Sequence, residues 1–208
     1  MVRRTKEEAL ETRNLILDSA ELVFRDKGVG HTTLADIAAA AGVTRGAIYW
    51  HFENKAALLQ AINDRVHLPL EAMNQVIADT NLDDPLRALR ETAVAVLRQA
   101  AEDARTRRVF EIFAFKCEYV GEMAAMLARQ RESRRACLAA IGGNLRHAVE
   151  KGQLPADLDV DRRAIGLYAL VSGLIDTWLL DPDGFDLAGM GAGLVEEFCA
   201  GLRAEGRK

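Results

Sequence analysis

Several side chains between positions 33 and 55 could hydrogen-bond the bases and phosphates of DNA. The Arg45 guanidinium can bond guanine O6 and N7 together, and the Tyr49 ring and hydroxyl suit a thymine methyl group or a phosphate. Ala47 can touch a thymine methyl, and Gly46 lacks the bulk that would keep a helix out of a groove. The other candidates suit phosphate oxygens or lie beside Tyr49, and they are Thr33, Thr44, His51, Lys55 and Trp50.

Two short helices joined by a tight turn would position these side chains. Gly42 supplies the turn, Ala38 is small enough for two helices to cross, and Thr33 and Thr44 can cap the two helices. The apolar spacing predicts a miniature core of Leu34, Ile37, Ala41, Val43 and Ile48. The N-terminal residues of a recognition helix meet base edges, and Arg45, Gly46 and Ala47 would form the first turn of the second helix. The pattern therefore predicts a helix-turn-helix. A plain helical hairpin is the alternative.

Residues 32–55 closely resemble the DNA-binding domain of TetR-family transcriptional repressors. Residues 2–9 and 103–108 resemble the AcrR/TtgR-type subfamily, which controls multidrug efflux pumps. The resemblance implies an all-α chain with a helix-turn-helix DNA-binding domain over residues 1–54 and a ligand-binding and dimerisation domain over residues 55–208. It also implies a repressor that binds an inverted-repeat operator as a dimer and is released by hydrophobic, drug-like or aromatic compounds.

The net charge of −4 is unusual for a chain that binds nucleic acid. Residues 1–55 contain eight basic and eight acidic residues, so this part is neutral and the remainder carries the whole −4. DNA binding must then depend on a few placed groups and on a dimer that combines two half-sites. Arg3, Arg4 and Lys6 form a basic N-terminal arm that could contact phosphates, or they form a solvated terminus.

Composition favours a soluble, helical protein of the cytoplasm. Half of the residues are hydrophobic and only 6% are aromatic, with long stretches rich in helix-forming residues. The three widely spaced cysteines lack paired Cys or His ligands, which indicates reduced thiols rather than disulfides or a metal site. No signal peptide and no uncharged run of membrane-spanning length occurs, so we expect no membrane partner, no metal and no cofactor.

Apolar spacing and capping residues predict about nine helices and no strand. Besides the two short helices, the expected elements are 6–27, 54–78, a helix starting at Pro85 behind Asp83 or Asp84, a helix capped by Asp103, 122–151, 161–180 and 186–202. Pro69 removes a hydrogen bond to the Arg65 carbonyl, which predicts a kink. The kink is either inert or the point at which a ligand alters the spacing of the DNA-binding domains.

The helix expected over residues 161–180 is apolar on almost all sides, so one neighbouring face cannot bury it. Together with the last helix it predicts a four-helix interface between two subunits, an arrangement that resembles TetR-family dimers. A core helix in a monomer is the alternative.

Four apolar stripes in the C-terminal part could fill a core or enclose a cavity. The resemblance implies a drug-binding pocket, because the same helices enclose one in the subfamily. The candidate ligand-binding residues are Val66, His67, Leu70, Leu89, Ala93, Val96, Phe110, Phe113, Ala114, Cys137, Leu138, Ile141, Tyr168, Val171, Ser172 and Ile175. A mostly apolar cavity with few polar groups would bind flat hydrophobic compounds with little stringency.

The sequence does not predict an enzyme. Only three serines occur, none in G-x-S-x-G, and the H-E-x-x-H, P-loop and G-x-G-x-x-G patterns are absent, so no catalytic residue is named. Two alternatives to an efflux repressor stay open. One is a TetR-like regulator of metabolism that senses fatty acyl or related ligands, and the other is a small-molecule enzyme or carrier on a helical scaffold.

Overall fold

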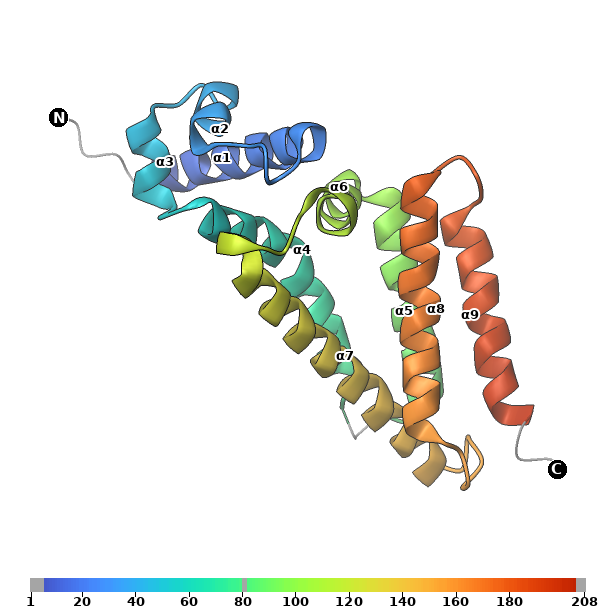
Figure 1. Ribbon diagram of the computed structural model, residues 1–208. Helices are drawn as coiled ribbons and strands as arrows, with labels where there is room; N and C mark the ends of the chain where they lie inside the picture. Colours follow the sequence, from blue (N-terminus) through green and yellow to red (C-terminus); the bar gives the residue numbers. More distant parts are fainter. Residues whose placement is uncertain (1–5, 80–81, 205–208) are drawn as a thin grey trace. The chain divides into compact units, whose positions relative to one another are not determined.

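The computed structural model describes residues 6–79 and 82–204 (Figure 1). Within these ranges every regular element is helical, which confirms the all-α prediction. The nine α-helices of the described residues are α1 (Lys6–Lys27), α2 (Leu34–Ala40), α3 (Arg45–His51), α4 (Lys55–Ile77), α5 (Pro85–Glu102), α6 (Ala104–Glu111), α7 (Ala124–Glu150), α8 (Val160–Leu180) and α9 (Leu187–Ala204). Between α6 and α7 lie a π-helix, η1 (Ile112–Lys116), and a 3-10 helix, η2 (Gly121–Met123).

Aspartate side chains cap several helices by accepting a backbone amide of the first turn. These caps are Asp84 for α5, Asp103 for α6, Asp159 for α8 and Asp186 for α9. The α8 helix begins at Val160, one residue before the expected start, because Asp159 Oδ1 accepts the Arg162 amide at 3.1 Å. Helix starts are therefore set by local hydrogen bonds that the sequence signals.

The chain forms two compact units whose boundaries fall inside helices. Unit 1 comprises residues 1–67 and 108–128, and unit 2 comprises residues 68–107 and 129–208, so α4, α6 and α7 each contribute to both. The domain boundary expected after residue 54 stays a prediction. The core of unit 1 includes fully buried side chains of α1, α2 and α3, namely Ile16, Leu17, Ala20, Phe24, Ile37 and Ile48.

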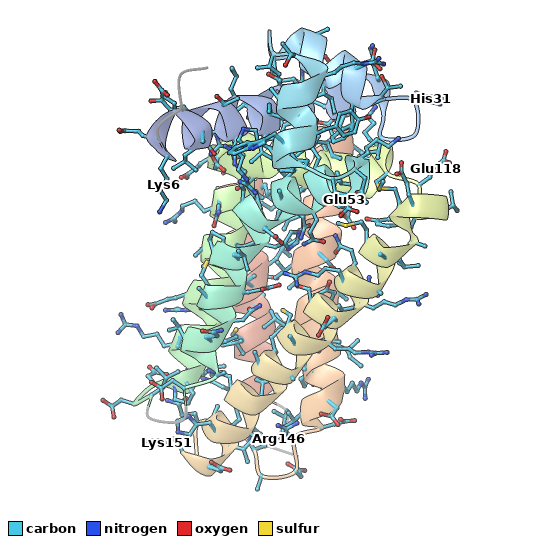
Figure 2. All side chains as sticks on the ribbon, turned by 90° about the vertical axis from the view of Figure 1, so that its left-hand side faces the viewer. Lys6, His31, Glu53, Glu118, Arg146 and Lys151 are labelled. Atoms are coloured by element: carbon cyan, nitrogen blue, oxygen red, sulfur yellow. The ribbon has the colours of Figure 1, made fainter. Side chains whose placement is uncertain are left out.

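In unit 2, α5, α8 and α9 run side by side (Figure 1). Gly191 lets α9 approach α5 closely, because a Cβ at this position would lie 2.9 Å from Leu97 Cδ1. The α7 helix ends at Glu150, and Gly152, the predicted stop, follows it in a turn with a φ of +70°. Figure 2 labels Arg146 and Lys151 at this end of α7, where the chain turns toward α8.

Two local features concern the helices α4 and α6. The α4 helix is continuous although Pro69 lies inside it, and the kink at that proline stays a prediction. The helix that follows Asp103 leaves the α-helical pattern at Ile112 and forms the π-helix η1, which the sequence analysis does not predict. The Tyr119 hydroxyl donates to the Phe113 carbonyl at 3.0 Å, so a side chain binds a carbonyl of η1. Burial raises the pKa of Tyr119 to about 12.

Candidate functional site

The first helix of the predicted helix-turn-helix begins with a reciprocal cap. Thr33 Oγ1 accepts the Asp36 amide at 3.2 Å, and Asp36 Oδ2 accepts the Thr33 amide at 2.9 Å. The Thr33 hydroxyl also donates to Asp36 at 2.6 Å, and Lys27 Nζ donates to Asp36 at 3.0 Å. These hydrogen bonds, those from Thr33 first, hold the pKa of the Asp36 carboxyl well below its usual range. The start of α2 is therefore fixed by bonds that require the carboxylate form.

Gly42 makes the turn between α2 and α3, as predicted. Its φ is +63°, a left-handed conformation that favours glycine, and the Val43 amide donates to the Ala38 carbonyl at 3.0 Å. Ala38 is buried, as expected of a small residue at a helix crossing, and Ile37 and Ile48 are fully buried beside the turn. The two helices are thus held at one crossing by a small apolar core.

Helix α3 presents an exposed face that carries most of the predicted DNA contacts. Thr44 Oγ1 accepts the Ala47 amide at 3.2 Å and caps the helix. Arg45 and Gly46 are exposed in the first turn, and Tyr49 and Trp50 are 60% and 72% exposed. Large aromatic side chains at such exposure, beside an arginine, are typical of a surface that binds a partner. Among the other DNA-binding candidates, Thr33 is exposed, and Ala47 and His51 are half-buried.

Lys55 lies in a different environment from the other candidates. Its ammonium group donates to the Val29 carbonyl at 2.8 Å and the Thr32 carbonyl at 3.1 Å, and it lies 3.5 Å from Glu122 Oε1. The side chain is only 16% exposed. In this conformation Lys55 holds the loop before α2, so a contact with a DNA phosphate would have to replace these interactions. The Val29 amide is held as well, because it donates to the Lys116 carbonyl at 2.8 Å.

The candidate ligand-binding residues of unit 1 include a small aromatic cluster. The His67 ring centroid lies 6.0 Å from that of Phe110 and 6.5 Å from that of Phe113, in edge or tilted arrangements. Val66 and Phe113 are buried, whereas Ala114 is exposed. Unit 1 therefore brings His67 and the two phenylalanines together.

The remaining candidates belong to unit 2 and differ in exposure. Leu89, Ala93, Ile141 and Ile175 are buried, and those that are half-buried are Leu70, Val96, Cys137, Leu138, Tyr168, Val171 and Ser172. The Ser172 hydroxyl donates to the Tyr168 carbonyl of its own helix at 2.8 Å. Burial raises the pKa of the Cys137 thiol, which suits an inert packing residue.

Polar bonds between α4 and α7 in unit 2 are functional candidates that the sequence analysis does not predict, although it names Cys137 among the ligand-binding candidates. Ser133 Oγ donates to Glu71 at 3.1 Å, and the Cys137 thiol lies 3.8 Å from Asn74 Oδ1. The buried Asn144 side chain donates to the Ile77 carbonyl at 3.0 Å. No local signal identifies them, because the partners lie more than 60 positions apart.

Two further predictions concern charged groups. Arg3 and Arg4 of the basic arm lie outside the described residues. Among the residues that the structure describes, no group of three His, Cys, Asp or Glu side chains could hold a metal ion.

Comparison with protein families identifies both parts of the chain. Residues 16–62 match the family of bacterial regulatory proteins named after TetR, and residues 84–203 match the C-terminal region of MAATS-type transcriptional repressors. The chain is 47% identical over 189 residues to the HTH-type transcriptional regulator TtgR of Pseudomonas putida, and the match covers 91% of this chain and 90% of TtgR.

Two solved structures have the same fold over almost the whole chain. NalD, described as the secondary repressor of the MexAB-OprM multidrug efflux pump in Pseudomonas aeruginosa, is 32% identical with a TM-score of 0.85, covering 96% of this chain and 100% of NalD. SmeT, the repressor of the Stenotrophomonas maltophilia multidrug efflux pump SmeDEF, is 34% identical in its triclosan complex, with a TM-score of 0.82 and coverage of 94% and 93%. With its capped helix-turn-helix and these matches, the chain belongs to the TetR family of bacterial transcriptional regulators.

Proposed function

We propose that this protein represses a multidrug efflux operon and leaves its operator when a hydrophobic, drug-like or aromatic compound binds. The observation that carries the proposal is the exposed face of α3, where Arg45, Tyr49 and Trp50 project from a helix capped by Thr44. The similarity to NalD and SmeT supports efflux control, since both are described as repressors of multidrug efflux pumps.

Each DNA-binding candidate of the helix-turn-helix has a proposed contact. Arg45 reads guanine through O6 and N7, Ala47 touches a thymine methyl group, and Tyr49 contacts a thymine methyl or a phosphate. Thr33, Thr44 and His51 bind phosphates and set the register, while Gly46 allows a close approach and Trp50 packs beside the DNA backbone. Lys55 supports this surface indirectly, because its ammonium group holds the Val29 and Thr32 carbonyls of the loop before α2.

We propose a homodimer formed through α8 and α9. Both helices expose large apolar side chains in the single chain: Ile165 and Leu180 on α8 are 59% and 72% exposed, and Met190 on α9 is 55% exposed. A second copy of the same surface would cover them, as expected for a symmetric interface. The α8 helix is long and apolar enough to cross a membrane by length and composition, a test that the core helix of a soluble protein also passes. We place the protein in the cytoplasm with its DNA.

We propose that the effector-binding residues include the aromatic cluster of His67, Phe110 and Phe113 in unit 1 and the apolar candidates of unit 2. The few polar groups among these residues favour flat, hydrophobic ligands. Triclosan is the first probe, because SmeT has been solved in complex with it.

The test uses a fluorescently labelled DNA fragment from upstream of the protein's own gene and follows its anisotropy at low salt. The wild-type protein should bind this fragment in preference to an unrelated one and should release it when triclosan is added. Arg45→Ala should remove the preference, because each bidentate base contact contributes about 1–3 kcal/mol of discrimination. Arg25→Ala is the matched control, since Arg25 pairs with Asp26 at the surface of α1.

Two outcomes contradict the proposed function, and a third contradicts the role of Arg45. No preferred binding upstream, together with turnover of a hydrophobic substrate, would favour an enzyme. Release by acyl compounds but not by triclosan or other aromatic drugs would favour a regulator of metabolism. Retained preference in Arg45→Ala would show that another residue reads the bases.

A further inference from the structure

Two buried side chains of α7 in unit 2 each keep an unused hydrogen-bonding atom. Asn144 and His147 are only 1% and 7% exposed. Asn144 Oδ1 and His147 Nδ1 are both buried, and neither finds a hydrogen-bond partner among the described residues. Because buried polar atoms in folded proteins are nearly always paired, these two atoms indicate a partner that is not part of the chain.

The fold fixes which amide atom of Asn144 is unused. Its Nδ2 donates at 3.0 Å to the carbonyl of Ile77, the last residue of α4. The last carbonyls of a helix have no partner within it, so this one needs a donor from elsewhere. A carbonyl can only accept, so the amide nitrogen of Asn144 must face it and the oxygen must face away. Oδ1 is therefore an acceptor that is open to the O–H or N–H of another molecule.

His147 lies on the same side of α7 as Asn144. Side chains three positions apart on a helix are neighbours, with Cβ atoms about 5–6 Å apart, so one oxygen atom can bond both. Asn144 Oδ1 only accepts, whereas the imidazole Nδ1 donates when it carries the proton. A hydroxyl group satisfies both atoms, because it donates one hydrogen and accepts another.

The same stripe of α7 carries residues that we propose for effector binding. Cys137, Ile141 and Asn144 follow a spacing of four and three, so Asn144 lies one turn beyond two of those candidates. Another polar candidate of unit 2 is already engaged, since the Ser172 hydroxyl donates to the Tyr168 carbonyl at 2.8 Å. Asn144 and His147 therefore add open polar atoms to a stripe that is otherwise mostly apolar.

We propose that Asn144 and His147 form a hydroxyl-binding subsite, in which the phenol of an aromatic effector donates to Asn144 Oδ1 and accepts from His147 Nδ1. The subsite rests on the proposed function, because it requires that the protein binds an effector. A trapped water molecule offers the same donor and acceptor chemistry. The two sources differ in one respect, since only a phenol makes the affinity of the effector depend on its own hydroxyl.

Triclosan and its O-methyl ether distinguish the two sources. The two compounds differ only in whether the phenol oxygen carries a proton or a methyl group. Isothermal titration calorimetry of the full-length protein gives the Kd of each compound. One net hydrogen bond corresponds to about tenfold in Kd, so the wild type should bind triclosan about tenfold more tightly than the ether.

His147→Phe is the decisive variant, because it keeps an aromatic ring and removes both ring nitrogens. It should weaken triclosan binding about tenfold and change the Kd of the ether by less than about threefold. Asn144→Leu also removes the bond to Ile77, so the ratio of the two Kd values is the quantity to compare, and this ratio should fall toward one. His31→Phe is the matched control, since His31 is an exposed histidine of unit 1, labelled in Figure 2, and this variant should behave like the wild type.

The outcomes separate failure of this inference from failure of the proposed function. An unchanged ratio in both variants would overturn the subsite, and a lower melting temperature alongside it would identify a trapped water. Loss of the phenol preference in His67→Phe, with the preference retained in His147→Phe, would assign the hydroxyl to the aromatic cluster of unit 1 and would also overturn the subsite. If neither compound binds the wild type, the proposed aromatic effector itself is contradicted, and the subsite with it.

Discussion

Replacing Lys55 with methionine tests whether its ammonium group holds the loop before α2 or binds a DNA phosphate. In the structure the group bonds the Val29 and Thr32 carbonyls and lies near Glu122, and the side chain is 84% buried by its neighbours, leaving 16% exposed. Methionine keeps the apolar stem and removes the three donors. If Lys55 holds the loop before α2, the substitution must lower the stability of the protein whether or not DNA is present.

The expected loss can be worked out from these contacts. Hydrogen bonds to a charged group contribute about 1.5–3 kcal/mol each, and the pair with the half-exposed Glu122 adds at most about 1 kcal/mol. Part of this is recovered because water can reach the freed carbonyls, which leaves about 3 kcal/mol. For a chain of this length a loss of 1 kcal/mol lowers the melting temperature by about 2–4 °C, so Lys55→Met should melt about 6–12 °C lower.

Thermal unfolding followed by far-UV circular dichroism measures this, with all proteins at one concentration because a dimer melts in a concentration-dependent way. Lys151→Met is the matched control, since Lys151 is exposed and its loss should cost no more than about 0.5 kcal/mol. A wild-type melting temperature in Lys55→Met, combined with weaker operator binding and a smaller salt dependence, would refute the reasoning and identify Lys55 as a phosphate ligand.

Three other substitutions test separate features. Gly191→Val should destabilise the protein by about 1–3 kcal/mol in urea unfolding, because its Cβ would meet the fully buried Leu97 at 2.9 Å; unchanged stability would mean that α5 and α9 can separate at little cost. Pro69→Ala should change triclosan-induced operator release more than triclosan affinity, measured by anisotropy and calorimetry, and equal changes in both would contradict a role for the proline in coupling. Asp36→Asn tests a pH dependence: the pKa of Asp36 is lowered in the folded state by its bonds to Thr33, so the stability that it contributes is present at neutral pH and is lost as the pH falls below about 4. The stability advantage of the wild type over Asp36→Asn should therefore shrink in acid, and a constant gap would count against the cap.

The sequence predicted the elements whose ends depend on neighbouring residues. Thr33 and Thr44 cap α2 and α3 as expected, and Gly42 adopts the left-handed turn between them. Each of these features needs only a side chain and an amide three positions away, or one residue that tolerates positive φ. Most helix starts could be predicted from the sequence, because most helices begin at such caps.

Interactions across long sequence separations were not predictable in this way. Glu21, Arg65 and Arg108 are ordinary charged residues in the sequence, and only the packing of α1, α4 and α6 gathers the two arginines around the buried Glu21 carboxylate. The position of Lys55 at a helix start suggested a phosphate contact, but in the fold its ammonium group donates to two loop carbonyls. The π-helix η1 has no cap or glycine to signal it.

The π-helix also limits how this chain can change in length. Its five residues, Ile112–Lys116, contain a wider turn than an α-helix, so deleting one residue would leave a chain that can still form a regular helix there. The deletion would nevertheless move the Lys116 carbonyl around and along the helix axis, away from the Val29 amide that it accepts at 2.8 Å. A surface loop tolerates such a deletion, but here the spacing from Arg108 to Lys116 sets the position of the loop that leads into α2. Length changes between these residues should therefore be selected against even where every remaining side chain is preserved.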